Sequence, residues 1–179
     1  PQGCKLEMTV QNRGCTVSQH YRCTADAAGD QRVTIYTPDG PVYESRIDRE
    51  TRWMESTNLV QGLTDILVDQ ADDHASFSTL LETGRDDFDF WTLSSNGERL
   101  HHVGHDELPG DKVSIDGVPL EVTRFELTTY SEAGEVLIER KGQQFISRAH
   151  GRFYGGIEQS KDWTGAVQDA NDSPVTFAF

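Results

Sequence analysis

Hydrophobic and polar residues alternate along most of the chain, a pattern typical of strands that bury one face. Val33 and Ile35 alternate with polar residues, and Tyr43, Ser45 and Ile47 share one face of the next segment. Further alternating segments lie at 52–56, 64–69, 87–93, 123–130, 135–141, 144–147, 152–159 and 174–179. The pattern therefore predicts a mainly β chain.

Turn dipeptides between these segments predict sequential hairpins. Asn96-Gly97 and Asp116-Gly117 are the residue pairs that two-residue hairpin turns favour, and Ala133-Gly134 joins two further segments in the same way. No change of composition marks a linker. We therefore expect one domain over residues 1–179, an antiparallel meander that forms a curved sheet or half-open barrel.

One segment departs from the alternation and predicts a short helix near His74–Thr83. Phe77, Leu80 and Leu81 have helical spacing, acidic residues precede them, and Gly84 follows as a helix stop. We expect this to be the one helix of the fold.

The strand that follows, at 87–93, is apolar on both faces. Phe88 and Phe90 share one face, while Trp91 and Leu93 share the other. This pattern is typical of a central strand that is covered on both sides, and we expect the helix to cover one of them.

The first two alternating segments predict a hairpin around the polar residues 12–14. Pairing Val10 with Val17 sets Cys4 directly opposite Cys23. Cross-strand Cα separations of about 4.5–5.5 Å lie within the range that a disulfide spans. The register therefore predicts a Cys4–Cys23 disulfide; reduced cysteines in a cytosolic protein are the alternative.

The third cysteine, Cys15, falls near the hairpin tip, where a partner beyond Phe179 is one possibility. The chain begins at Pro1 without an initiator Met, which we interpret as the trace of a removed secretory signal, although a cloned fragment would look the same. With the predicted disulfide, this favours a periplasmic or secreted bacterial protein.

Charge narrows the range of partners. Sixteen Lys and Arg against thirty Asp and Glu give a formal net charge of −14. Such a surface repels phosphate backbones and anionic lipid heads, so nucleic acid is a poor partner. No apolar run reaches the roughly 18 residues that a membrane span needs, so membrane insertion is not expected.

Histidines and carboxylates supply the candidate chemistry. His101 and His105 would share a metal only on a helix. A strand sets them too far apart and turns His102 to the opposite face, so no metal and no cofactor are predicted. Asp87 and Asp89 share a strand face that Trp91 continues, an environment that raises a carboxyl pKa. They are the candidate pair for a hydrolase.

Catalytic motifs such as a nucleophile elbow, a Walker loop or HExxH are missing from the sequence. The chain therefore favours a non-enzymatic role: binding an apolar small molecule or an envelope protein on the curved sheet. Trp53, Phe90 and Trp91 are the candidate ligand-binding residues, with simple core packing as the alternative.

Two stretches resemble an uncharacterised family of secreted bacterial β-rich proteins. They are FSxLLxTGRDDFDF, within 76–90, and GHDELPGDKVSIDGVPLEVTRFEL, at 104–127. The order of hairpins with one early helix is more loosely similar to LolA-like periplasmic half-barrels. The first resemblance implies a secreted β-rich protein and the second a half-barrel architecture; neither assigns a residue a role.

Overall fold

The computed structural model describes residues 2–179, which form fourteen strands and one helix. The strands are β1 (Cys4–Asn12), β2 (Val17–Cys23), β3 (Gln31–Thr37), β4 (Gly40–Ile47), β5 (Trp53–Asn58), β6 (Leu63–Leu67), β7 (Arg85–Ser94), β8 (Arg99–Glu107), β9 (Lys112–Ile115), β10 (Val118–Ser131), β11 (Val136–Ser147), β12 (Arg152–Asp162), β13 (Val167–Asn171) and β14 (Pro174–Ala178). The helix α1 (Phe77–Thr83) lies between β6 and β7.

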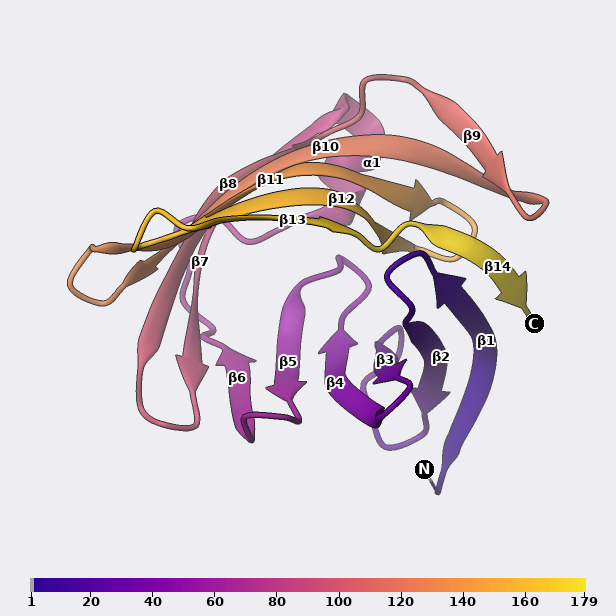
Figure 1. Ribbon diagram of the computed structural model, residues 1–179, viewed down its shortest axis with the longest axis horizontal. Coiled ribbons are helices and arrows are strands. Elements are labelled where there is room, and N and C mark those ends of the chain that lie inside the picture. Colours follow the sequence, from indigo (N-terminus) through magenta and orange to yellow (C-terminus); the bar gives the residue numbers. More distant parts are fainter. Residues whose placement is uncertain (1) are drawn as a thin grey trace.

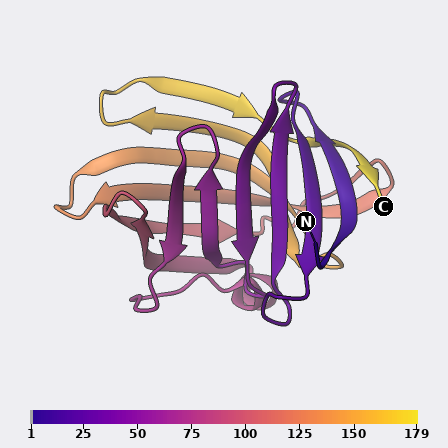
Figure 2. The same cartoon turned by 90° about the horizontal axis from the view of Figure 1, so that it is seen from below.

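All fourteen strands belong to one antiparallel sheet, which confirms the predicted β meander. Their order is β13-β12-β11-β10-β8-β7-β6-β5-β4-β3-β2-β1-β14, and β9 pairs with β10 beside this path. Strands β1–β6 form a lower layer, and strands β7, β8 and β10–β12 arch over them (Figure 1). Seen from below, the two layers run across one another (Figure 2).

The sheet curls without closing into a barrel within the described residues. Its end strands, β13 and β14, each have one hydrogen-bonded neighbour there, although they follow one another in the chain. Between them, Asp172 N donates to Gly156 O at 2.8 Å, and Arg13 N donates to Ser173 O at 2.9 Å. These two hydrogen bonds extend the pairing of β13 with β12 and of β14 with β1, and the open edges themselves stay unpaired in the described residues.

Side-chain packing joins β1 to the arch, where no backbone hydrogen bonds of the described residues connect the strands. A cluster of buried residues joins β1 to the arch, and we call it the seam cluster. It contains Met8, Val10, Val118, Leu120, Val122, Phe145 and Tyr154. Apolar contact across the gap replaces ladder hydrogen bonds, since burial of these side chains favours the rolled sheet.

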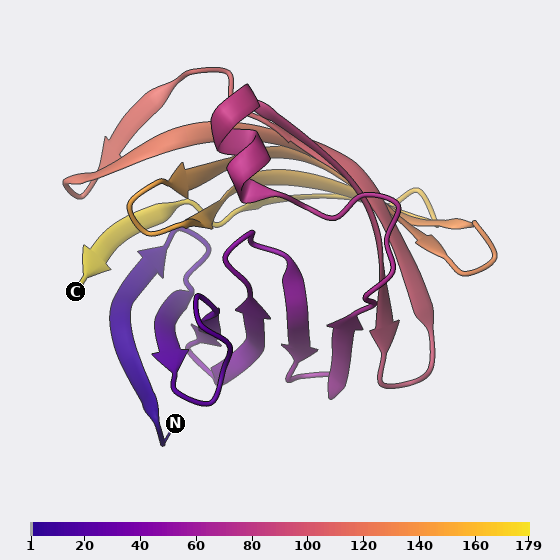
Figure 3. The same ribbon diagram turned by 180° about the vertical axis from the view of Figure 1, so that it is seen from behind.

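The helix α1 is confirmed, in a shorter form than its predicted range. It begins after the N-cap Ser76 and ends at Gly84, whose φ of 83° is the left-handed conformation that glycine adopts without strain. Phe77 and Leu80 are its buried residues. Viewed from behind, α1 and the segment leading to it lie against the arch (Figure 3). At seven residues, this helix of the described chain is too short to cross a membrane.

The start of α1 differs from the prediction, because no acidic residue lies in its first turn. A carboxylate from elsewhere takes that role. Both N and Oγ of Ser78 donate to Glu50 Oε2 at 2.9 Å, so the loop between β4 and β5 caps the helix. These hydrogen bonds lower the pKa of Glu50.

The prediction that both faces of the strand at 87–93 are covered is wrong. Phe88 and Phe90 are buried, but Trp91 is half-buried and Leu93 is 37% exposed. Since the sheet is curled, one face of β7 lines the interior and the other faces solvent. The outer face of β7 is apolar without being buried.

The N-terminal hairpin contains the predicted disulfide between Cys4 and Cys23, and those residues are register partners. Beyond Leu6 the predicted register is wrong. A bulge between Leu6 and Met8 pairs Val10 with Ser18 rather than with Val17. The extra residue turns Met8 and Val10 toward the seam cluster, and that burial outweighs unbroken pairing.

Removing the disulfide tests how the hairpin is held. We expect Cys4→Ser with Cys23→Ser to lose about 3 kcal/mol of stability, because the bridge no longer restricts the unfolded chain. The melting temperature should fall by roughly 6–12 °C, measured by circular dichroism. Cys15→Ser, which changes the exposed free cysteine, is the control. Equal melting temperatures for the double variant and this control would contradict the account.

Candidate functional site

A cavity of about 270 Å³ lies between the arch and the lower layer. Strands β7, β10 and β12 of the arch contribute phenylalanines and one leucine to the cavity wall. Strand β5 of the lower layer contributes a tryptophan. The large apolar residues of its wall are Ile47, Trp53, Leu67, Phe88, Phe90, Phe125, Leu127 and Phe153. Aromatic and aliphatic side chains therefore form much of the cavity wall, and Arg52, Asp106, Arg140, Gln144 and Glu158 add polar groups to it.

The pairing of β8 with its neighbours β7 and β10, together with the glycine at position 104, positions the rings that line the cavity. Gly104 of β8 pairs with Phe88 on one side and with Leu127 on the other. A Cβ atom at Gly104 would lie 2.9 Å from the Phe88 ring, closer than carbon atoms approach. Glycine at this position therefore lets Phe88 lie flat over β8 and line the cavity.

Trp53 packs edge-to-face on two other rings. Its ring centroid lies 5.5 Å from that of Phe90 and 5.5 Å from that of His102. The two nitrogens of His102 hydrogen-bond to Thr92 Oγ1 at 2.9 Å and Thr129 Oγ1 at 3.0 Å. Burial lowers the pKa of His102 to about 4, so the ring beneath Trp53 is neutral at neutral pH.

The three candidate ligand-binding residues separate in the structure. Trp53 and Phe90 line the cavity, whereas Trp91 does not. Trp91 stacks on His101, with centroids 4.3 Å apart, and the Arg99 guanidinium lies 5.2 Å from its ring. Adjacent strand residues point to opposite faces, so Phe90 inside places Trp91 outside. The expectation that Trp91 lines the cavity is wrong.

The candidate carboxylate pair also lies on the outer face of β7. Asp87 is paired with Arg85 at 2.6 Å, and Asp89 accepts from His101 Nε2 at 2.5 Å. The hydrogen bonds from Arg85 lower the pKa of Asp87, contrary to the raised value expected beside Trp91. Both carboxylates share a face, as predicted, but neither lines the cavity.

Strand β8 distributes its histidines over two faces. His101 lies outside beside Asp89, and His105 lies outside near Glu107, whereas His102 is buried inside. Within residues 2–179 no group of three potential ligands is placed to hold a metal ion. The absence of a metal in the protein stays a prediction.

Two carboxylates whose meeting the sequence did not predict lie at the cavity wall or directly beside it. Asp106 lines the cavity, and Asp86 is its register partner on β7. Burial, with the charge of Asp86, raises the pKa of Asp106 to about 7. Burial also raises the pKa of Asp86 to about 6, although Ser76 N donates to its Oδ2 at 2.8 Å. Only the pairing of β7 with β8 reveals this pair.

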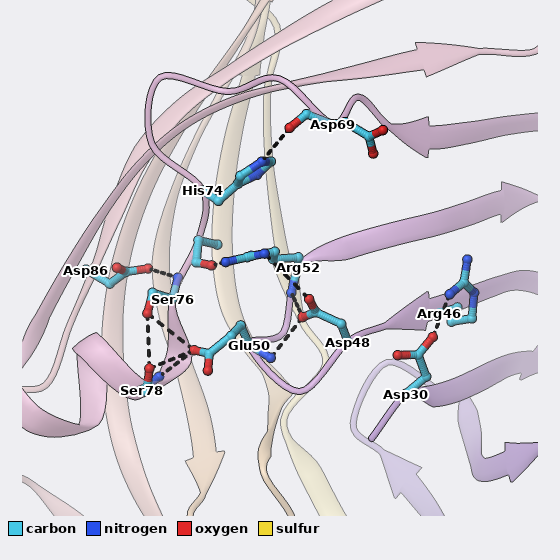
Figure 4. Close-up of polar contacts among 11 residues, drawn as sticks. Asp30, Arg46, Asp48, Glu50, Arg52, Asp69, His74, Ser76, Ser78 and Asp86 are labelled. Carbon is cyan, nitrogen blue, oxygen red and sulfur yellow. Dashed lines mark hydrogen bonds and ion pairs between the residues drawn. The ribbon is translucent and has the colours of Figure 1, made fainter. Parts of the chain in front are cut away.

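The loop between β4 and β5 forms part of the cavity rim (Figure 4). Thr51 lines the cavity with φ of 60°, which is strained for a β-branched residue. Asp48 Oδ1 holds the loop by accepting from Glu50 N at 2.8 Å and Arg52 N at 3.0 Å. Arg52 Nε in turn donates to Ala75 O at 3.2 Å.

The segment before α1 forms the facing part of the rim. His74 and Ala75 line the cavity, and Nε2 of His74 lies 3.0 Å from Asp69 O. Ser76 Oγ donates to Glu50 Oε2 at 3.3 Å, which ties this segment to the β4–β5 loop (Figure 4). Two loops that line the cavity are therefore hydrogen-bonded to one another.

Comparisons of the chain with protein-family models, with curated proteins and with solved structures find no match. The resemblance to secreted β-rich proteins and half-barrels therefore stays a prediction. Function has to be inferred from the geometry and chemistry of the interior.

The carboxylate pair predicts an unusual pH dependence of stability. In the folded protein Asp106 keeps its proton to about pH 7, whereas the unfolded chain releases it near the ordinary value of 3.8. Ionisation therefore disfavours the folded state, and this contribution to stability is lost as the pH rises from 4 to 7, by up to about 1.4 kcal/mol per pH unit.

We expect Asp106→Asn, which cannot ionise, to gain stability relative to the wild type over the same interval. Urea unfolding at pH 4, 5.5, 7 and 8 measures the difference. Asp87→Asn, on the solvent face, is the control and should not reproduce the gain. A difference between Asp106→Asn and wild type that is independent of pH would exclude a buried, protonated Asp106.

Proposed function

We propose that this chain is a non-enzymatic binding protein of the bacterial envelope that holds a small apolar ligand in the cavity. The observation that carries the proposal is an unfilled volume bordered by the rings of Trp53, Phe88, Phe90, Phe125 and Phe153. A core serving stability alone is close-packed, since a void loses contacts on every wall.

The volume suggests the size of the ligand. A cavity of 270 Å³ corresponds to about nine water volumes of roughly 30 Å³ each. It lies just below the roughly 300–1,000 Å³ of sites for drug-sized molecules. An aliphatic chain of about eight carbons, or a single aromatic ring with a short substituent, fits these limits.

The disulfide supports the proposed compartment. Disulfides persist in oxidising surroundings such as the periplasm or the extracellular space. The Cys4–Cys23 bridge joins neighbouring strands of the first hairpin. We therefore place the protein in the periplasm or outside the cell.

The placement of Asp87 and Asp89 gives no support to the alternative of a hydrolase. Both face solvent on β7, and each is paired with a basic side chain. An apolar ligand is also favoured over a protein partner as the main occupant, because the rings of Phe88, Phe90 and Phe125 face the interior.

Binding of octanoate tests the proposal. In a protein carrying Trp91→Phe and Trp163→Phe, the remaining tryptophan is Trp53 on the cavity wall. We expect its emission to change in a saturable way as octanoate is added. 1-Octanol, which has the same chain without the charge, shows how much of the affinity comes from apolar contact.

Calorimetry on single variants locates the site. We expect Trp53→Ala to weaken octanoate binding by about tenfold or more, because a ring contributing over 1 kcal/mol is lost. Trp163→Ala, which removes a tryptophan that is 76% exposed, should bind as wild type does. Equal weakening by both variants, or no binding by wild type up to the solubility limit, would retire the proposal.

A further inference from the structure

A second interior region, between β12 and the first hairpin, gathers basic side chains. Arg152 is 3% exposed and His20 is 5% exposed. His20 packs edge-on against Tyr154, with ring centroids 5.7 Å apart. Tyr154 belongs to the seam cluster, so this polar group lies beside the contact that holds the rolled sheet together.

Arg152 carries a buried charge that no carboxylate of the described residues contacts through a hydrogen bond, although the charge of Glu7 acts on it. Its Nε and Nη1 are buried, and neither has a hydrogen-bond partner among residues 2–179. Burial lowers the pKa of Arg152 to about 10, so the guanidinium remains charged at neutral pH. A buried cation without a counter-charge is strongly unfavourable, and proteins pair such groups.

His20 presents two further buried nitrogens. Neither Nδ1 nor Nε2 has a partner in the described part of the chain. Burial and the charge of Arg152 lower its pKa well below the usual value, so the ring is neutral. A neutral imidazole carries one N–H donor, which can be offered to an acceptor near Arg152.

The surrounding polar groups are committed to other partners. The negative charge of Glu7 raises the pKa of Arg152, but the hydrogen bond that Glu7 Oε1 accepts, at 2.9 Å, comes from Arg22 Nε. The Tyr154 hydroxyl donates to Met8 Sδ at 3.1 Å and lies 2.7 Å from His150 Nδ1.

Arginines elsewhere in the chain do have acidic partners. Arg32 is paired with Asp26, and Arg46 with Asp30. In a chain with thirty acidic residues, the buried Arg152 has no hydrogen bond to a carboxylate within residues 2–179. Its surroundings thus fit a counter-charge that comes from outside the chain.

We propose that Arg152 and His20 form a binding site for a small monovalent anion of the chloride class. The anion would accept from Arg152 Nε and Nη1 and from the N–H of His20, and its charge would neutralise the guanidinium. Met8, Phe145 and Tyr154 of the adjacent seam cluster are each less than a tenth exposed, so we choose a compact ion for the proposal. This proposal is independent of the apolar cavity.

Unfolding in chloride tests the site. Urea midpoints are measured from 0 to 300 mM sodium chloride, with sodium gluconate added to keep the ionic strength constant. We expect chloride to stabilise the wild type; at tenfold the dissociation constant, the unfolding equilibrium constant falls about 11-fold. No chloride effect at constant ionic strength would overturn the proposal.

Matched arginine variants assign the effect. Arg152→Met should lose the chloride response, whereas Arg148→Met, which alters an exposed arginine paired with Glu121, should keep it. His20→Phe preserves the ring packing and removes the donor, so it should weaken the response even if Arg152→Met fails to fold. A wild-type response in both Arg152→Met and His20→Phe contradicts the site.

Bromide locates the anion directly. Crystals grown in sodium bromide should show an anomalous peak within hydrogen-bonding distance of Arg152 Nε or Nη1. Peaks on the surface alone would mean an adventitious ion only, and would overturn the assignment.

Discussion

Apolar contact between β1 and the arch holds a sheet whose two edge strands do not pair with each other. Met8 and Val10 reach across to Phe145 and Tyr154, while the link from β13 to β14 makes its backbone hydrogen bonds to β12 and to the residue that follows β1. An unsupported sheet of this length would expose one face to water. Because this contact rolls the sheet, the arch stands over the lower layer and a cavity remains between them.

The rolled sheet also explains why polar groups occur inside. Asp86 and Asp106 lie side by side on β7 and β8 with raised pKa values, and Arg152 lies beside the seam cluster with two unpaired nitrogens. Each arrangement destabilises the fold on its own. Buried carboxylates with raised pKa values and buried nitrogens without hydrogen-bond partners are expected at sites where a protein binds a ligand. Here they lie at two separate places in the interior.

Local rules predicted a large part of this fold. Alternation predicted the meander, turn dipeptides predicted the hairpins, and short-range register predicted the bridge between Cys4 and Cys23, because each depends on residues close in sequence. The sequence does not predict that Trp91 lies on the outer face of the sheet. Its strand is apolar on both faces, and only the curl of the sheet decides which face is inside.

The polar residues of the interior could not be predicted from the sequence, for a different reason. Asp86 meets Asp106 across twenty residues, and Arg152 approaches His20 from the other end of the chain. The register of the β7–β8 hairpin brings the first pair together, and the roll of the sheet brings the second pair together. The Thr51 conformation at the cavity rim likewise depends on Asp48 holding the loop.

The central claim is that the aromatic interior is a binding cavity, and NMR tests it most directly. Isotope-filtered nuclear Overhauser spectra of the labelled protein with unlabelled octanoate report which side chains lie within about 5 Å of the ligand. The account predicts contacts from the octanoate chain to the rings of Phe88, Phe90 and Phe125. Contacts confined to exposed residues such as Ile157 on the outer face of β12, with none to these rings, would contradict it.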